Sequence, residues 1–189
     1  MSHAPVPAAS VRPVLADLLP GERLRDVALV GTFALAIALS AQLAFPLPGT
    51  PVPVTGQTFV VLLGAAALGP GRAAVGASLY AVVGLLGVPW FAVTGGASLG
   101  YVAGFVAAAW VVGRFARAGV LSTWRGAAVA MVIGNLVIYT LGASVLALVL
   151  GVGPQAAVSM GVAPFLVGDL VKVAAATALL PATQKLLDR

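Results

Sequence analysis

Six apolar segments follow one another along the chain, and Pro, Gly and charged residues mark their limits. The segments lie at residues 27–45, 56–69, 73–88, 98–116, 127–150 and 161–181. A helix that spans the hydrocarbon core of a bilayer needs about 20 predominantly apolar residues, within a range near 17–25. The pattern therefore predicts six transmembrane helices, of which the second is short and the third is marginal in length.

The composition indicates an integral membrane protein. With 61% hydrophobic and 8% charged residues, and a mean hydropathy of +1.10, the 189 residues carry too little polar surface for a soluble domain. The apolar stretch that begins at Val27 is too long for the core of a signal peptide. We predict an all-α membrane protein with a tail at 1–26, a six-helix domain at 27–184 and a short end at 185–189.

All basic residues except Lys172 fall on one side of the predicted membrane. They lie before the first segment, between the second and third, around the fourth-to-fifth connection and after the sixth: Arg12, Arg23, Arg25, Arg72, Arg114, Arg117, Arg125, Lys185 and Arg189. The opposite connections, near 46–55, 89–97 and 151–160, contain no Lys or Arg. The positive-inside rule then predicts a multi-pass plasma-membrane protein with both termini cytoplasmic. It also explains the net charge of +5 without nucleic-acid binding.

An acidic and a basic residue lie three apart within the sixth segment. Asp169 is the only acidic residue between Asp26 and Asp188, and Lys172 follows it on the same face of a helix. A charge at mid-helix costs at least about 2.5 kcal/mol on insertion scales, so an intramembrane pair indicates a functional site. The alternative is a structural salt bridge that pins two helices.

The outward connections are unlike ordinary surface loops. The first carries four prolines between residues 46 and 53, which make it stiff. The second places Trp90 and Phe91 before Gly95 and Gly96, a pair that allows a tight turn or a close approach of the backbone to a ligand. Such loops suit a lid over a small molecule, although the two aromatic residues also fit an interfacial belt.

Polar side chains within or beside the spans complete a candidate pocket. Together with Asp169 and Lys172, they would line one cavity that opens outward: Thr55, Gln57, Tyr80, Tyr101, Asn135 and Tyr139. Each alone is a weak signal, since such residues also bond between helices, for about 0.6 kcal/mol. The sole histidine is His3, and there is no cysteine. The spans therefore lack His, Cys and paired carboxylates, which disfavours catalysis and metal binding, and we predict a binding protein that is not an enzyme and needs no cofactor.

Small residues form smooth stripes on two helices. In the first segment they are Gly31, Ala34, Ala38 and Ala41, and in the fourth they are Gly100, Gly104 and Ala108. Stripes of this kind let helix backbones approach closely. They serve packing within one chain or contact with a partner protein.

Five ordered blocks of sequence resemble the BioY family. They read PVPVTGQT at 51–58, LYAVVGLLGVP at 79–89, GYVAGF at 100–105, GNLVIY at 134–139 and GDLVK at 168–172, and the resemblance covers about residues 35–180. It implies the six-helix bundle of the S components of energy-coupling factor (ECF) transporters, with a biotin site near the outer face. It also implies AxxxA contacts from the first helix to a transmembrane coupling subunit, matched here by Ala34 and Ala38. The family's Gly-rich stretch is shortened here to GGASLGY at 95–101.

Biotin fits the chemistry of the candidate pocket. Its ureido ring offers two N–H donors and one carbonyl acceptor, and its thiophane ring and valeryl chain need apolar walls. Asp169 would accept a ureido N–H, and Lys172 or Asn135 would donate to the ureido oxygen. The aromatic residues would shield the ring: Tyr80, Trp90 and Phe91. The valerate carboxylate has several candidate partners, which are Lys172, Gln57, backbone N–H groups and water.

The chain contains no GxxxxGK[ST] phosphate-binding loop, so energy for uphill transport would come from separate coupling and ATPase subunits. The sequence therefore predicts a high-affinity biotin-binding subunit of a transporter in the lipid bilayer. The alternatives are an S component for another vitamin, such as thiamine or riboflavin, and a structural membrane protein without transport function.

Overall fold

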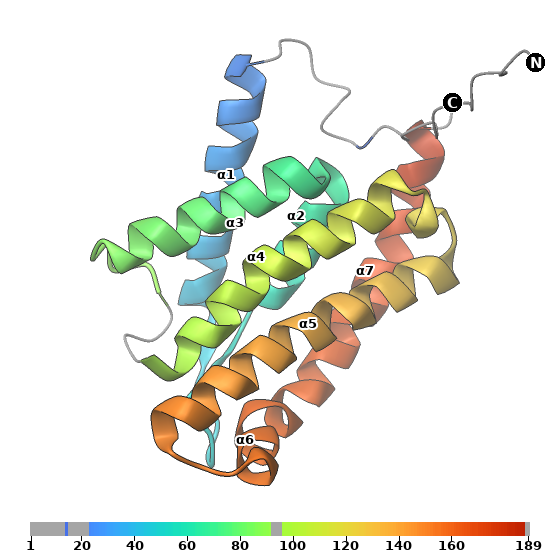
Figure 1. Cartoon of the computed structure of the whole chain (residues 1–189). Helices are drawn as coiled ribbons and strands as arrows, with labels where there is room; N and C mark the ends of the chain where they lie inside the picture. Colours follow the sequence, from blue (N-terminus) through green and yellow to red (C-terminus); the bar gives the residue numbers. More distant parts are fainter. Residues whose placement is uncertain (1–13, 15–22, 92–95, 188–189) are drawn as a thin grey trace, which may run out of the picture.

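The computed structural model describes residue 14 and residues 23–91 and 96–187, with side chains described to residue 180. These residues form a bundle of helices (Figure 1). Its main helices are α1 (Arg23–Gln42), α2 (Gln57–Leu68), α3 (Pro70–Leu85), α4 (Gly96–Arg117), α5 (Trp124–Leu150) and α7 (Leu166–Leu187). Each predicted apolar segment overlaps one of them, which confirms the prediction of an all-α bundle with six main helices.

Two of the main helices are short for a membrane span. α2 has 12 residues and α3 has 16, and at 1.5 Å per residue they reach about 18 and 24 Å, less than the hydrocarbon core of ~30 Å. Within the described ranges, four helical stretches are long and apolar enough to cross a membrane: Arg23–Gln42, Gly96–Arg117, Trp124–Leu150 and Pro154–Leu180. The predicted shortness of the second and third segments is thus confirmed.

Two of the connections predicted to face outward contain structure that the sequence pattern did not predict. Strands β1 (Ala44–Phe45) and β2 (Val54–Thr55) pair antiparallel around the Pro-rich loop, with Ala44 opposite Thr55. Helix α6 (Pro154–Gly161) and the 3₁₀ turn η3 (Ala163–Phe165) fill the connection between α5 and α7. Proline at the first turn of α6 is favourable, because its missing N–H has no partner there in any helix.

Local sequence signals explain where several helices begin and end. Gly69 has a φ of 78° and directly precedes Pro70, so α2 turns into α3 without a loop. A second 3₁₀ turn, η2 (Val120–Ser122), leads to α5. Thr123 caps α5 by accepting a hydrogen bond from the Gly126 N–H at 3.1 Å.

Helices α4 and α5 are in close backbone contact, as the stripe on the fourth segment predicted. A Cβ added at Gly104 would lie 2.8 Å from the Ile138 Cα, and one at Gly100 would lie 2.5 Å from the Leu141 carbonyl oxygen. Neither position has room for a methyl group. This contact places the pocket-facing residues of α4 and α5 next to one another.

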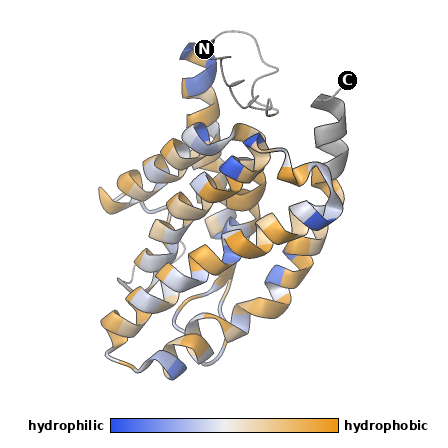
Figure 2. Cartoon of the chain, turned by 45° about the vertical axis from the view of Figure 1, so that its right-hand side comes forward, coloured by the Kyte–Doolittle hydropathy of each residue, from blue (hydrophilic) through white to orange (hydrophobic). Residues whose placement is uncertain are grey.

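The outer faces of the helices are apolar, and hydrophobic colours run along most of each helix in Figure 2. Leu39, Leu136, Leu148 and Val167 are among the exposed large side chains. In Figure 1 the start of α1 and the end of α7 lie at one end of the bundle, and α6 and the β1–β2 hairpin lie at the other. Apolar side chains exposed between the two ends are those that a bilayer would cover.

Candidate ligand-binding site

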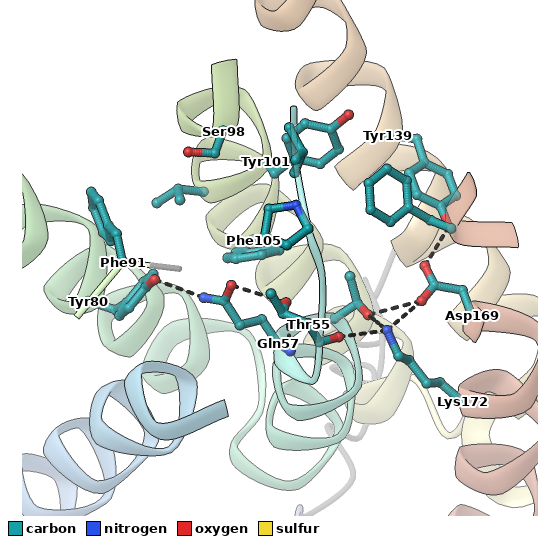
Figure 3. Close-up of a pocket in the computed structure, with 15 residues that line it drawn as sticks. Thr55, Gln57, Tyr80, Phe91, Ser98, Tyr101, Phe105, Tyr139, Asp169 and Lys172 are labelled. Atoms are coloured by element: carbon teal, nitrogen blue, oxygen red, sulfur yellow. Dashed lines mark hydrogen bonds and ion pairs between the residues drawn. The ribbon is translucent and has the colours of Figure 1, made fainter. Parts of the chain in front are cut away.

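A pocket lies near the end of the bundle that holds the hairpin. It contains about 580 Å³ of empty space with its open mouth included, and its walls are concave and mostly apolar with a few convergent polar groups, as is typical of small-molecule sites. The hairpin, the start of α2, and α3, α4, α5, η3 and α7 contribute its lining (Figure 3), which consists of Val52, Pro53, Thr55, Gln57, Thr58, Tyr80, Phe91, Ser98, Tyr101, Val102, Phe105, Tyr139, Phe165, Asp169 and Lys172.

One side of the pocket carries the intramembrane ion pair. The Lys172 ammonium donates to Asp169 Oδ1 at 2.7 Å, to Thr58 Oγ1 at 2.8 Å and to the Thr55 carbonyl oxygen at 2.8 Å. The Tyr139 hydroxyl donates to Asp169 Oδ2, and the Thr58 hydroxyl donates to Oδ1 at 3.2 Å. The pair lies within α7, so the salt bridge itself does not pin two helices. The additional hydrogen bonds connect α7 to β2, α2 and α5.

These hydrogen bonds leave one acceptor position on the carboxylate. An ammonium has three N–H donors, and all three of Lys172 are used. A carboxylate has about four acceptor positions, of which Asp169 uses two on Oδ1 and one on Oδ2. The free position on Asp169 Oδ2 can accept an N–H from a ligand. The charge of the carboxylate strengthens such a bond.

The other polar group of the pocket is neutral. Gln57 is buried, and its Nε2 donates to the Tyr80 hydroxyl at 2.8 Å while its Oε1 accepts from Thr55 Oγ1 at 3.2 Å. Because Tyr80 is the acceptor in the first bond, its own hydroxyl proton remains available to a ligand oxygen. In Figure 3 the Gln57–Tyr80 pair and the Asp169–Lys172 pair lie on opposite sides of the pocket.

Aromatic rings form the wall beside Tyr80. The ring centroid of Tyr80 lies 5.3 Å from that of Phe91 and 5.5 Å from that of Trp90, distances typical of favourable aromatic pairs. A Cβ added at Gly84 would lie 2.1 Å from the Phe91 ring, so Phe91 occupies the space that this glycine leaves. Trp90 Nε1 donates to the Tyr80 carbonyl oxygen at 3.1 Å, which fixes Trp90 behind the wall.

Metal binding has no support among the residues that the structure describes. They contain no group of three or more His, Cys, Asp or Glu side chains that could hold a metal ion. The pocket thus offers one carboxylate, one ammonium, neutral hydrogen-bonding groups and apolar walls.

Comparison with known proteins identifies the family. The model of the BioY family matches residues 10–189. The chain belongs to the BioY family. It is 33% identical over 170 residues to the biotin transporter BioY of Thermotoga maritima, an alignment that covers 86% of this chain and 98% of the relative. It is 35% identical over 170 residues to the biotin transporter BioY of Rhodobacter capsulatus, with 79% and 87% covered.

A solved structure has the same fold as this BioY-family chain. It is the crystal structure of the S-component for biotin from an ECF-type ABC transporter, with a TM-score of 0.77 over 89% of this chain and 95% of that chain. The sequence identity is 17%, so the likeness concerns the fold. The predicted S-component bundle is therefore confirmed.

Most of the site residues predicted from the sequence lie together in the pocket. Eight of them line it: Thr55, Gln57, Tyr80, Phe91, Tyr101, Tyr139, Asp169 and Lys172. Their contact with a ligand stays a prediction. Tyr101 contributes its ring only, because its hydroxyl donates to the Gly161 carbonyl oxygen at 2.7 Å and so joins α4 to α6.

Three of the predicted site residues lie elsewhere. Asn135 lines a second, smaller cavity on the far side of Lys172, and Trp90 packs behind Tyr80. Gly96 is exposed at the start of α4, where a Cβ would meet Val149. Gly95 lies outside the described residues.

Several lining residues were not predicted as site residues. They are mostly apolar and come from the hairpin, α2, α4 and η3, with a hydroxyl at two positions: Val52, Pro53, Thr58, Ser98, Val102, Phe105 and Phe165. Thr58 alone carried a signal, since it is polar and lies beside Gln57 at the start of an apolar segment. An apolar residue that faces a pocket looks the same in sequence as one that faces lipid.

The two alanines predicted to meet a coupling subunit are buried inside the bundle. The exposed fractions are 1% for Ala34 and 6% for Ala38, and both belong to the apolar core. This burial favours packing within the chain, which was the alternative for the stripe. Partner contact at Ala34 and Ala38 stays a prediction.

Proposed function

We propose that this BioY-family chain is a biotin-binding membrane subunit that mediates biotin uptake with separate coupling and ATPase subunits. The observation that carries the proposal is the pocket itself, with an anionic acceptor on one side, neutral donors on the other and apolar walls. The names of the relatives support the same substrate. The absence of a phosphate-binding loop from the sequence supports the need for a separate ATPase.

The ureido ring of biotin is placed on the side of the ion pair. One ureido N–H donates to the free acceptor position on Asp169 Oδ2. The ureido oxygen accepts from Lys172, which gives up one of the three acceptors that it holds without ligand. The buried carboxylate and ammonium then exchange hydrogen bonds with the ligand while their charges stay paired.

The valerate carboxylate is placed near Gln57 and Tyr80. The other described basic side chains, from Arg23 to Arg125, lie near the helix ends that are predicted to be cytoplasmic. Neutral donors are therefore the groups that line this side of the pocket. The Tyr80 hydroxyl proton and the remaining N–H of Gln57 can both point to a carboxylate oxygen. The ring of Phe91 covers the alkyl chain.

Ligand binding to the purified protein tests the substrate. Isothermal titration calorimetry in detergent should give a saturable biotin signal, and thiamine and riboflavin should neither bind nor compete. Mass spectrometry of small molecules that co-purify with the protein should detect biotin. Binding of thiamine or riboflavin in the absence of biotin binding would assign the pocket to another vitamin.

Biotin methyl ester tests the placement of the carboxylate. A hydrogen bond to a charged group contributes about 1.5–3 kcal/mol, so the ester should bind the wild-type protein roughly 10- to 150-fold more weakly than biotin does. The same esterification should have a smaller effect in Tyr80→Phe, in which only the Gln57 donor remains. An equal loss in both proteins would place the carboxylate away from Tyr80.

A further inference from the structure

A second cavity lies between α2, α5 and α7 on the far side of Lys172. It is lined by Thr58, Phe59, Leu62, Met131, Asn135, Lys172, Val173 and Ala176. Lys172 and Thr58 also line the ligand pocket, so the two cavities share these side chains. The second cavity is small, on the scale of a single buried water molecule.

Asn135 brings an unsatisfied hydrogen-bond acceptor to this cavity. Its side chain is 6% exposed, and its Oδ1 has no hydrogen-bond partner in the part of the chain that the structure describes. A buried acceptor without a partner costs stability, so native structures rarely keep one without a water or an ion. A cation is disfavoured here because the Lys172 ammonium lines the same space.

We propose that the second cavity is a specific site for one water molecule, which donates to Asn135 Oδ1 and to Thr58 Oγ1. Thr58 Oγ1 donates to Asp169 and accepts from Lys172, and a hydroxyl oxygen has a second acceptor position for the water. Asn135 is then a positioning residue for the ligand site. It acts through the water on Thr58, and through Thr58 on the ammonium and the carboxylate.

This assignment changes the role that the sequence suggested for Asn135. Direct donation to the ureido oxygen needs Asn135 in the ligand pocket, and its side chain lines the other cavity. Asn135 and Tyr139 lie one helical turn apart on α5. Tyr139 donates a hydrogen bond to Asp169 directly. Asn135 would act on the same carboxylate indirectly, through the proposed water and Thr58.

The water site can be tested with three variants in nanodiscs, by calorimetry of biotin binding. This test rests on the proposed function. Asn135→Leu fills the space with an apolar side chain of similar size and expels the water. We expect about ten-fold weaker biotin binding, the size of one lost hydrogen bond to a polar network. Asn135→Ala leaves room for a second water in place of the amide and should bind biotin more tightly than Asn135→Leu. Met131→Leu, an apolar change in the same cavity, should bind as wild type does.

A dry cavity predicts the reverse order, because leucine would fill it and alanine would enlarge it. Unchanged affinity in Asn135→Leu with a loss in Asn135→Ala would therefore overturn the proposal. An experimental wild-type structure that resolves ordered water gives a test independent of biotin and of the folding of any variant. Density within hydrogen-bond distance of Asn135 Oδ1 is expected, and an empty cavity would overturn the inference. Failure of wild-type protein to bind biotin would instead contradict the proposed function.

Discussion

At Asp169, one carboxylate accepts hydrogen bonds from three elements of the bundle. Tyr139 of α5, Thr58 of α2 and Lys172 of α7 itself all donate to it. A purely structural role does not explain a buried ion pair well, because apolar residues of similar volume often stabilise a protein equally well. Asp169 lines the pocket, which favours the proposed role in ligand binding over a structural one.

Replacing Asp169 by Asn should weaken biotin binding by about 2–5 kcal/mol, the range for truncating one member of a buried charged pair. The amide keeps the size of the carboxyl group and loses the charge that balances Lys172. Calorimetry on the purified protein measures the effect. Asp26→Asn is the matched control, because Asp26 lies on α1 and pairs with Arg72 outside the pocket. Equal affinity in Asp169→Asn and wild type would remove Asp169 from the site.

Gly84→Ala should weaken biotin binding while the protein stays folded. The added methyl group would lie 2.1 Å from the Phe91 ring, so the ring must move away from its position beside Tyr80. We expect a loss of about 1 kcal/mol, the scale of one aromatic contact. Gly87→Ala does not serve as a control, because Gly87 has a φ of 100°. Gly31→Ala does, since nothing lies within 4 Å of an added Cβ there. The result would contradict the Phe91 wall if both variants bound biotin as wild type does.

The polar half of the pocket could be predicted from the sequence, and the apolar half could not. Asp169, Lys172 and Gln57 stand out because polar groups are costly inside a membrane. Phe105 and Phe165 carry no such signal, because an apolar residue is expected at every position of a span. Asn135 shows a second limit: helical spacing places it on the face of Tyr139, but spacing does not say which of two neighbouring cavities each side chain enters.

At the level of elements, burial separates the two faces of α1. Phe33, Ala34, Ile37 and Ala38 face the bundle, and Leu35 and Leu39 face outward. The small residues therefore allow α1 to pack closely against its own bundle in this structure. A partner protein that binds α1 would contact the outward face, which carries Leu35 and Leu39.

Ala38→Trp should destabilise the protein by about 1–3 kcal/mol or more, because it overpacks a site that is 6% exposed. We expect a lower melting temperature in detergent, together with weaker biotin binding and lower uptake. Leu39→Trp is the control on the next residue, which is 71% exposed, and it should leave melting and binding unchanged. Retained affinity and melting in Ala38→Trp, with uptake lost, would instead support a coupling subunit at Ala38.

Elements that connect spans were harder to predict than the spans. Periodicity and length mark a long apolar helix clearly, and all six main helices were found. Helix α6 has eight residues, and β1 and β2 have two each. None of the three is long enough to show a clear hydrophobic periodicity. Pro154 signals the start of α6 only once a helix is already suspected.

At the level of the whole molecule, charge and fold give one consistent arrangement. The Asp26–Arg72 ion pair, at 2.9 Å, joins the start of α1 to the start of α3. An added Cβ at Gly69 would meet Arg117 Nε at 3.1 Å, which places the end of α4 beside the α2–α3 turn. The described basic residues other than Lys172 thus gather toward one end of the bundle, and the ligand pocket lies toward the other.

This separation predicts that the pocket faces the outside of the cell. The native chain has no cysteine, so single introduced cysteines report their own position without background. Gln155 is exposed on α6, beside the pocket end, and Ala118 is exposed just after α4, at the basic end. In intact cells, Gln155→Cys should react with a membrane-impermeant thiol reagent and Ala118→Cys should not, by the positive-inside rule. Ala118→Cys should react after the cells are permeabilised, which controls for accessibility. Labelling of Ala118→Cys but not of Gln155→Cys in intact cells would reverse the orientation and place the pocket on the cytoplasmic side, where it could not capture biotin from outside.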